Sequence, residues 1–353
     1  MSNKTAVILF NLGGPDKISS VKPFLFNLFN DKAIISAPQP FRFFIAKLIS
    51  GLREKKAQKI YSQISNKSPI VEITNSQARD LEKELSFCKE FKVFVAMRYW
   101  HPFVQETIKS IEEFAPNQII LLPLYPQYST ATTASSFDDF YKYFLKSTLY
   151  KKNVIVKKIC CYFDNDDFIE SHCELIKNSL NNYKENFANL RILFSAHGLP
   201  QKLIDQGDPY VYQIENTTKK IMSRFCEKNN YDEKEIDFRI CYQSKVGPLK
   251  WTSPSLDYEV TRAALDDKNI AVIPIAFVSE HSETLVELDI EYKQKAQQLG
   301  IKKYIRIPAL NINSYFIKSL ANICLEASKE NNISDFFNTR KCPQYCKKCP
   351  NKL

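Results

Sequence analysis

The sequence lacks an apolar run of the ~20 residues that a membrane-spanning helix needs, and it contains no recognised nucleic-acid-binding motif. Its first stretch, MSNKTAVILFNLGGP, has neither a basic region nor a cleavable apolar core, so it is not typical of a secretory signal. The net charge of +10 comes from lysines spread along the chain, which indicates solvated faces. We therefore expect a cytoplasmic protein that does not bind nucleic acid.

Nucleotide-binding glycine motifs are also missing. NLGGP (11–15) follows an apolar run, but it is not GxGxxG and no Walker lysine follows it. A tight turn from a strand into a helix explains this stretch as well as an anionic ligand does. The chain contains only four histidines, so the position of each of them is informative.

Short apolar runs alternate with longer helical patterns. Runs rich in Val, Ile and Phe without polar alternation predict strands that are buried on both faces, and these runs are 5–10, 92–97, 118–125, 154–161, 190–196, 238–244, 270–279 and 304–310. The helical patterns between and after them are 101–115, 136–150, 165–185, 209–228, 255–268, 281–299 and 314–330. This alternation predicts an α/β protein with parallel sheets that are covered by helices on both sides.

A chain of 353 residues is long for one core, so two domains are expected. We place the boundary near residue 150. The first domain is then 1–150, completed by the helix 314–330, the second is 151–313, and 331–353 is a tail that contains cysteines.

A histidine lies where one strand pattern ends. In LRILFSAHGLP (190–200), the apolar run stops at Ser195 and His197. Ligands of parallel α/β sheets bind beyond the carboxyl ends of the strands. His197 is therefore a candidate functional residue, and a histidine satisfied within the core is the alternative.

An acidic stretch, FVSEHSETLVELDIEY (277–292), contains five carboxylates and His281 but no Lys or Arg. In a regular helix, Glu283, Glu287 and Glu291 would stack on one face. Such a row is either a solvated acidic face or a path for metal ions or protons, because clustered carboxylates raise each other's pKa.

Three further stretches are informative. In 121–136 a dense Ser/Thr run follows a strand, and its hydroxyls either cap the next helix or bind a ligand. In 241–255, Gln243, Ser244, Lys245 and Trp251 follow another strand. In 37–61 an apolar face precedes basic residues, which is typical of an ordinary surface helix or of a segment on a membrane surface.

Together these motifs resemble the ferrochelatases. SAHGLP, PLYPQYST, GDPY (207–210), YQSKVGPLKW and IAFVSEHSETLVELDIEY occur in that family at similar separations. The resemblance covers nearly the full length. It implies two Rossmann-like domains and the insertion of Fe²⁺, as substrate, into protoporphyrin IX to form haem, without a cofactor required for the chemistry.

The resemblance also implies roles for individual residues. His197 and Glu283 match the catalytic pair that handles protons and iron, and we expect them to act on opposite sides of the porphyrin ring. His281, Glu287 and Glu291 match an acidic relay. Positions that match the porphyrin-binding residues are Leu12, Arg53, Ser68, Arg98, Tyr99, Tyr125, Ser129 and Trp251. Segment 38–49 matches a lip that contacts the membrane in the family.

Two departures from the family pattern matter. SNKSP (65–69) replaces a glycine-rich GGGSP, which weakens the expected contacts of Ser68 with a propionate. Leu12 stands where the branch that acts on coproporphyrin has tyrosine, which favours protoporphyrin IX.

The tail contains Cys342, Cys346 and Cys349. Some ferrochelatases hold a [2Fe–2S] cluster with three such cysteines and a fourth from elsewhere. The usual fourth position is Thr130 here, so Cys160 or Cys161 is the substitute. A zinc site and unligated thiols are the alternatives. The other cysteines lie among apolar neighbours and are expected in the core.

Two rival functions stay open at this stage. One is a chelatase for another metal or tetrapyrrole, and the other is a haem-binding module without catalysis. The row of carboxylates favours an enzyme over the second. The sequence does not determine the oligomeric state.

Overall fold

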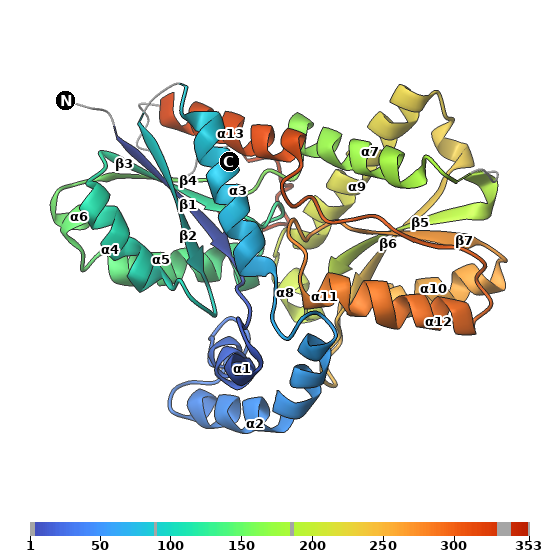
Figure 1. Cartoon of the computed structure of the whole chain (residues 1–353), viewed down its shortest axis with the longest axis horizontal. Coiled ribbons are helices and arrows are strands. Elements are labelled where there is room, and N and C mark those ends of the chain that lie inside the picture. Colours follow the sequence, from blue (N-terminus) through green and yellow to red (C-terminus); the bar gives the residue numbers. More distant parts are fainter. Residues whose placement is uncertain (1–3, 88–89, 184–186, 330–339, 352–353) are drawn as a thin grey trace. The chain divides into compact units, whose positions relative to one another are not determined.

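The structure is a computed structural model that describes residues 4–87, 90–183, 187–329 and 340–351 (Figure 1). The chain divides into two compact units. The first contains residues 1–161, 320–340 and 350–353, and the second contains residues 162–319 and 341–349. Each unit has its own four-stranded sheet, and all strand pairs are parallel. The predicted α/β fold class is confirmed.

The sheet of the first unit has the strand order β2-β1-β3-β4. Its strands are β1 (Thr5–Asn11), β2 (Phe91–Met97), β3 (Gln118–Pro123) and β4 (Ile155–Lys158). The helices that belong wholly to this unit are α1 (Val21–Phe29), α2 (Phe41–Ser62), α3 (Ile70–Leu85), α4 (Val104–Phe114), α5 (Ser135–Phe144) and α6 (Thr148–Lys151).

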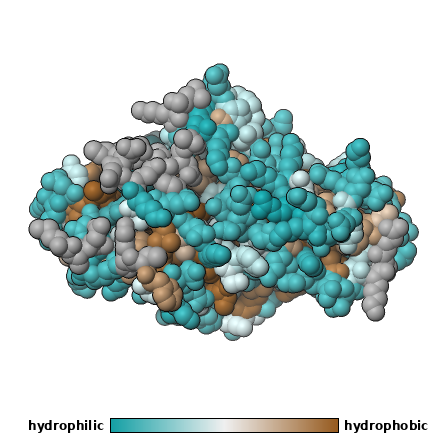
Figure 2. All heavy atoms as spheres, turned by 90° about the horizontal axis from the view of Figure 1, so that it is seen from above, coloured by the Kyte–Doolittle hydropathy of each residue, from teal (hydrophilic) through white to brown (hydrophobic). Residues whose placement is uncertain are grey.

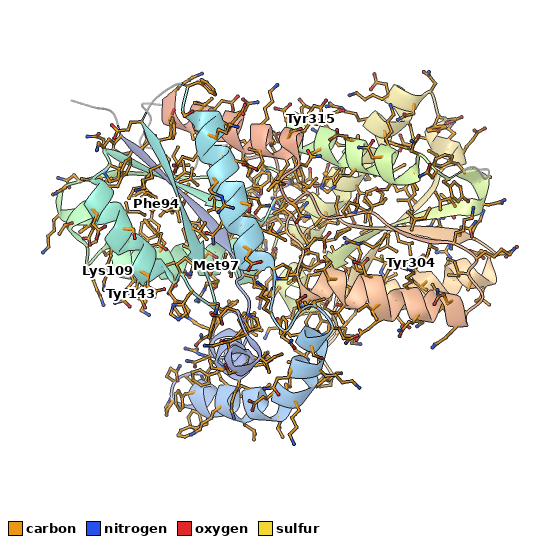
Figure 3. The ribbon with its side chains drawn as sticks, in the orientation of Figure 1. Phe94, Met97, Lys109, Tyr143, Tyr304 and Tyr315 are labelled. Atoms are coloured by element: carbon orange, nitrogen blue, oxygen red, sulfur yellow. The ribbon has the colours of Figure 1, made fainter. Side chains whose placement is uncertain are left out.

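The central strand β1 shows why this sheet forms. Every residue of TAVILFN is buried, so both faces of the strand are covered. Alternate residues point to opposite faces. Ala6, Ile8 and Phe10 pack with apolar residues of α4 and α5, and Phe94 of β2 joins the same cluster (Figure 3). A continuous apolar strand is therefore stabilised by helices rather than by solvent on one side.

The sheet of the second unit has the order β6-β5-β7-β8. Its strands are β5 (Leu190–His197), β6 (Asp237–Gln243), β7 (Asn269–Pro274) and β8 (Tyr304–Arg306). The helices are α7 (Asp166–Leu180), α8 (Gln201–Asp205), α9 (Tyr210–Asn229), α10 (Leu256–Leu265), α11 (Ser282–Leu285) and α12 (Lys293–Gln298), and α13 (Ser314–Lys329) contributes its first residues.

The strand predictions hold for all eight strands, but the predicted domain boundary differs from the observed one. β4 lies after residue 150, yet it pairs with β3 through Gln118–Leu121 and Ile155–Lys158. The first unit therefore extends to Cys161, and the second division falls within α13. β7 and β8 are shorter than predicted because pairing ends at Pro274 and Arg306.

The acidic stretch is not one regular helix. α11 ends at Leu285, a π-helical segment covers Glu287–Tyr292, and α12 follows. A π-helix has i→i+5 hydrogen bonds and more residues per turn than an α-helix, so residues four apart still lie close to one face. The expectation of one regular helix is therefore wrong, whereas the alignment of Glu283, Glu287 and Glu291 stays a prediction.

The surface is mostly polar on the face that Figure 2 shows, where hydrophilic side chains predominate. Within the described residues, none of the helices combines the length and apolar character needed to cross a membrane. α2 is an exception to the polar surface, since Phe41, Phe44, Leu48 and Leu52 are 66%, 63%, 64% and 75% exposed. Their spacing places them on one face of the helix.

One histidine is buried in the core of the second unit. His172 of α7 is 1% exposed and lies with its ring centroid 4.9 Å from that of Phe168. Neither ring nitrogen has a hydrogen-bond partner among the residues that the structure describes. Burial disfavours the charged imidazole and lowers the pKa of His172 to about 3.

We expect His172 to make the fold acid-sensitive. In the unfolded chain His172 is protonated with a pKa near 6.5, whereas in the folded chain it is protonated only near pH 3. Stability is therefore lost as pH falls below 6.5, by about 2 kcal/mol at pH 5 for this one group. His172→Leu should remove that part of the loss. Urea unfolding at pH 7.5 and pH 5 measures it, and an equal loss in both proteins contradicts it.

Candidate active site

The candidate site lies at the carboxyl end of the second sheet. His197 is the last residue of β5 and is in register with Gln243, the last residue of β6. Gly198 follows, and its N–H donates to the carbonyl of Gln243 at 2.9 Å. A Cβ on Gly198 would lie 3.1 Å from that oxygen and 3.2 Å from the Trp251 ring. Glycine therefore allows the strand end, the β6 end and the indole to approach closely.

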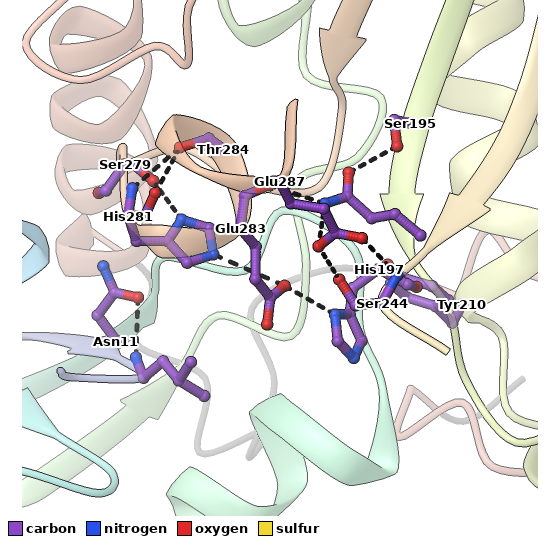
Figure 4. Close-up of polar contacts among 12 residues, drawn as sticks. Asn11, Ser195, His197, Tyr210, Ser244, Ser279, His281, Glu283, Thr284 and Glu287 are labelled. Atoms are coloured by element: carbon purple, nitrogen blue, oxygen red, sulfur yellow. Dashed lines mark hydrogen bonds and ion pairs between the residues drawn. The ribbon is translucent and has the colours of Figure 1, made fainter. Parts of the chain in front are cut away.

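His197 and Glu283 are in direct contact. The Nδ1 atom of His197 lies 2.8 Å from Oε2 of Glu283 (Figure 4). Their side chains are 34% and 29% exposed, so the pair is reached by solvent. No flat ring fits between two hydrogen-bonded groups. The expectation that the two groups stand on opposite sides of a porphyrin does not agree with this contact.

The contact perturbs both groups. Burial disfavours the imidazolium, but the carboxylate of Glu283 outweighs this effect, with a contribution from Glu287, and the pKa of His197 is raised. Burial acts to raise the pKa of Glu283, but His197 and then His281 reverse this, and the pKa of Glu283 is lowered. The pair therefore favours an ionic state in which His197 carries the proton.

A second histidine lies on the other side of Glu283. His281 is 5% exposed, and its Nδ1 is 3.1 Å from the carbonyl of Ser279. Because a carbonyl only accepts, Nδ1 carries a hydrogen and Nε2 is the nitrogen nearer Glu283. That Nε2 lies 3.8 Å from Oε2 of Glu283. Glu283 is thus flanked by two imidazoles.

Glu287 is held by the end of β6. Its Oε1 accepts from the Ser244 N–H at 3.0 Å, and its Oε2 accepts from the Ser244 hydroxyl at 2.6 Å and from Gln243 Nε2 at 3.1 Å. Burial and the nearby Glu283 outweigh these donors, and the pKa of Glu287 is raised. Glu283 and Glu287 are therefore two neighbouring carboxylates whose pKa values are shifted in opposite directions. Such a pair suits the transfer of a proton.

The other acids of the stretch have different surroundings. Arg306 of β8 binds Glu280 at 2.6 Å and both oxygens of Asp289 at 2.7 and 3.1 Å. These two acids are neutralised by an arginine distant in sequence, although the stretch itself has no cation. Glu291 is exposed. The relay role of Glu291 stays a prediction.

Aromatic rings border the histidine. The rings of Trp251 and Phe277 lie 6.3 and 6.2 Å from that of His197. The Trp251 N–H donates to the Val246 carbonyl at 3.1 Å, which fixes the indole. Tyr210 donates its hydroxyl hydrogen to the His197 carbonyl at 3.1 Å. Tyr210 and Phe277 were not predicted, although Tyr210 belongs to the GDPY motif.

In the first unit, Arg98 and Tyr99 belong to an internal network. Asp31 accepts from Arg98 at 2.9 Å, from the Tyr99 hydroxyl at 2.7 Å and from Ser135 at 2.7 Å. Tyr99 is 2% exposed. Burial opposes ionisation of Asp31, but Arg98 and these hydroxyls outweigh it and lower the pKa of Asp31. Asp31 was not predicted, because no motif marks it.

The other residues of the first unit that were predicted to bind porphyrin lie in different environments. Ser129 is fully buried and accepts from the Ala131 N–H at 3.1 Å, so it caps the next segment, as one alternative proposed. The guanidinium of Arg53 lies 5.7 Å from the Phe29 ring centroid. Ser68 is 4% exposed and Leu12 is partly buried, while Tyr125 has its pKa raised by burial. Their roles toward a porphyrin stay predictions.

Ser68 lies against the NLGGP turn. A Cβ on Gly14 would come within 2.5 Å of the Ser68 Cβ, and Gly13 has φ +84°. Both glycines are therefore needed for the turn and for its close packing. The interpretation of NLGGP as a tight turn is confirmed, and SNKSP packs beside it.

The tail residues 341–349 belong to the second unit. Cys342 accepts from Gln213 Nε2 at 3.2 Å, and the Lys348 N–H donates to the Gly207 carbonyl at 2.9 Å. Cys342 and Cys346 are 6% and 1% exposed. Over the described part of the chain, no three His, Cys, Asp or Glu side chains form a group able to hold a metal ion. The tail as folded here does not fit a cluster or a zinc ion.

Most other cysteines are in the core, as expected. Buried side chains are those of Cys160, Cys161, Cys173, Cys226, Cys241 and Cys324. The sulfur atoms of Cys160 and Cys161 are 3.3 Å apart in the first unit. Cys88 lies outside the described residues.

The parallel sheets and the strand-end His–Glu pair define an α/β protein with a candidate acid–base site. A similar solved structure is that of SirB from Bacillus subtilis with Fe³⁺, with a TM-score of 0.53 and 11% identity, covering 96% of this chain and 100% of that one. This similarity shows the fold. Residues 4–328 match the Ferrochelatase family.

Two curated relatives agree with that match. The chain is 48% identical to a ferrochelatase of Rickettsia bellii (strain OSU 85-389) over 352 residues, which is 98% of this chain and 94% of the relative. It is 48% identical to a ferrochelatase of Wolbachia sp. subsp. Brugia malayi (strain TRS) over 354 residues, with 92% and 100% covered. The chain belongs to the ferrochelatase family. It is a lyase of haem synthesis whose reaction is the insertion of ferrous iron into protoporphyrin.

Proposed function

We propose that His197, Glu283 and Glu287 remove the two pyrrole protons while ferrous iron enters protoporphyrin IX. The observation that carries this proposal is the 2.8 Å contact between His197 Nδ1 and Glu283 Oε2. Because this contact occupies Nδ1, the other nitrogen, Nε2, is left to meet a substrate. Nε2 of neutral His197 is a proton acceptor.

The proton then passes into the acidic cluster. When Nε2 takes a pyrrole proton, Glu283 stabilises the resulting imidazolium, which agrees with the raised pKa of His197. Glu287 has a raised pKa and faces the same cluster, so it accepts a proton more readily than an ordinary glutamate. Trp251 and Phe277 flank His197 and supply apolar surface for the porphyrin macrocycle. Contacts of this kind can bind the flat macrocycle and distort it.

Iron is the second substrate rather than a resident ion. Ferrous iron accepts both imidazole and carboxylate ligands. Glu283 and the Nε2 atom of His281 are 3.8 Å apart and offer that mixture beside the proton-accepting His197. Leu12, in place of the tyrosine of the coproporphyrin branch, supports protoporphyrin IX as the porphyrin.

The test of this function is anaerobic iron insertion into protoporphyrin IX, followed by the absorbance change as porphyrin becomes haem. Coproporphyrin and cobalt serve as the competing substrates. Haem formation from protoporphyrin supports the proposal. Turnover with coproporphyrin alone, or porphyrin binding without turnover, rejects it.

We also propose that the apolar face of α2 docks on an anionic membrane surface. Phe41, Phe44, Leu48 and Leu52 are exposed on one side, and Lys55, Lys56 and Lys59 follow along the same helix. An apolar face beside basic residues binds where acyl chains and anionic headgroups meet. The macrocycle of the substrate is apolar, so a site near a membrane gives it access to the lipid phase.

For this surface, Leu48→Ser with Leu52→Ser should weaken binding to anionic phosphatidylserine vesicles by about tenfold, because two exposed leucines lose their burial in lipid. Vesicle sedimentation measures the binding. Leu265→Ser, at a leucine that is 83% exposed in α10, is the matched control and should bind like the unchanged protein. Equal binding of all three proteins contradicts this assignment.

The [2Fe–2S] cluster at Cys342, Cys346 and Cys349 stays a hypothesis that the described geometry does not support. We derive no step through it. The visible spectrum and acid-labile sulfide content of protein purified without oxygen test it. A brown chromophore that disappears in Cys346→Ser supports the cluster, and a colourless protein without labile sulfide rejects it.

A further inference from the structure

Gln243 lies at the centre of the site without an assigned role. It is the last residue of β6, it is 2% exposed, and its strand position is beside His197. Its carbonyl accepts from the Gly198 N–H at 2.9 Å. The backbone of Gln243 therefore belongs to the strand end that presents the catalytic histidine.

Its side-chain amide has only one favourable orientation. The Nε2 atom lies 2.9 Å from the Glu283 carbonyl and 3.1 Å from Oε2 of Glu287. Both partners of Nε2 act as acceptors here, so the NH₂ group must face them, and a flipped amide would place oxygen against oxygen. The opposite atom, Oε1, lies 2.6 Å from the Ser195 hydroxyl, which donates to it.

Ser195 makes this orientation stable. It is fully buried in β5, two residues before His197, and its hydroxyl needs an acceptor. The amide oxygen of Gln243 thus accepts the hydrogen bond from Ser195 of β5, and its NH₂ group donates to Glu283 and Glu287 of the acidic stretch. One side chain links the strand of the histidine to both glutamates of the cluster.

The Gln243 side chain positions the backbone of Glu283 and also donates to the carboxylate of Glu287. Through the carbonyl of Glu283, the amide holds the first turn of α11, from which Glu283 reaches His197. Through Oε2, it shares Glu287 with the Ser244 hydroxyl. Glu283 and Glu287 lie on either side of the change from α-helix to π-helix, so their spacing is not fixed by one regular helix.

We propose that Gln243, oriented by Ser195, is a positioning residue for iron insertion that sets the placement of Glu287 relative to the His197–Glu283 pair. The inference rests on the proposed proton-accepting role of this cluster. It assigns no contact between Gln243 and the substrate. Its loss is therefore expected to affect turnover rather than porphyrin affinity.

The test compares Gln243→Glu and Gln243→Met with Gln298→Glu, a control at an exposed glutamine of α12. Each Gln243 variant removes both N–H donors, which should lower kcat by 10- to 100-fold, the usual effect of losing a hydrogen bond to a charged group. The KM for protoporphyrin should stay within about twofold. Ser195→Ala should lower kcat less, because both N–H bonds remain.

Coupling to Glu287 separates positioning from general damage. In a Glu287→Gln background, Gln243→Met should lower kcat by less than about threefold, because the group it places is already altered. A full additional loss, a parallel rise in KM, or a kcat loss that follows a fall in melting temperature overturns the proposal. If His197→Gln and Glu283→Gln keep full activity, the proposed function fails instead, independently of Gln243.

Discussion

Glu283→Gln is expected to lower the rate of iron insertion by at least about 100-fold while protoporphyrin still binds. Glutamine keeps the size of the side chain but cannot carry the negative charge that stabilises protonated His197 at 2.8 Å. Proton transfer by a positioned side chain is usually worth 10²- to 10⁴-fold in rate. Stopped absorbance assays measure kcat, and the change in porphyrin fluorescence on binding gives Kd.

The same substitution should move the pH dependence of the residual activity. His197 must be neutral to accept a proton, so activity rises with pH through its pKa. Glu283 holds that pKa above its usual range, and without this carboxylate burial, which lowers the pKa, is opposed only by Glu287. The acidic limb should therefore shift to lower pH. An unchanged limb with full kcat removes Glu283 from the mechanism.

The exposed His101–Glu106 pair of the first unit provides the matched control. Its Nδ1 to Oε2 distance is 2.9 Å, and the two side chains are 56% and 49% exposed. Glu106→Gln keeps a capping side chain at the start of α4. It should leave both kcat and the pH profile unchanged, which shows that any effect at Glu283 depends on its site.

His197→Gln is expected to reduce kcat by about 100- to 1000-fold, because it removes the only imidazole bonded to Glu283 at hydrogen-bond distance among the described residues. Its amide retains polarity but accepts no proton near neutral pH. The measured rate should also lose its acidic limb between pH 5 and 8.

Stability serves as the second readout for His197→Gln. The side chain is 34% exposed, so its replacement should change the melting temperature little. His101→Gln is the corresponding control and should keep full activity. If His197→Gln loses activity only in proportion to a loss of folded protein, its chemical role is contradicted.

Several elements were predictable because local pattern decides them. Continuous apolar runs such as TAVILFN predicted strands that are buried on both faces, and every residue of that strand is buried. SAHGLP predicted a histidine at a strand end, which is where His197 lies. The apolar face of α2 followed from residue spacing alone.

Other features were not predictable because they depend on partners distant in sequence. The carboxylates of the acidic stretch had no cation nearby in the chain, yet Arg306 neutralises Glu280 and Asp289. Arg98 was expected to face a substrate, and the structure shows that it forms an ion pair with Asp31 and donates a hydrogen bond to Ser135. Glu291 is exposed, which no local pattern in the sequence decided.

The sequence by itself determined the fold class, the family and the identity of the two central residues, because strand burial, helix alternation and the motif residues are local properties of the chain. Only the tertiary structure decided that His197 and Glu283 touch, that Gln243 joins them to Glu287, and which carboxylates are neutralised. Those facts depend on parallel strand register and on side chains that meet after folding, over separations of 40 residues or more between Gln243 or His197 and the two glutamates.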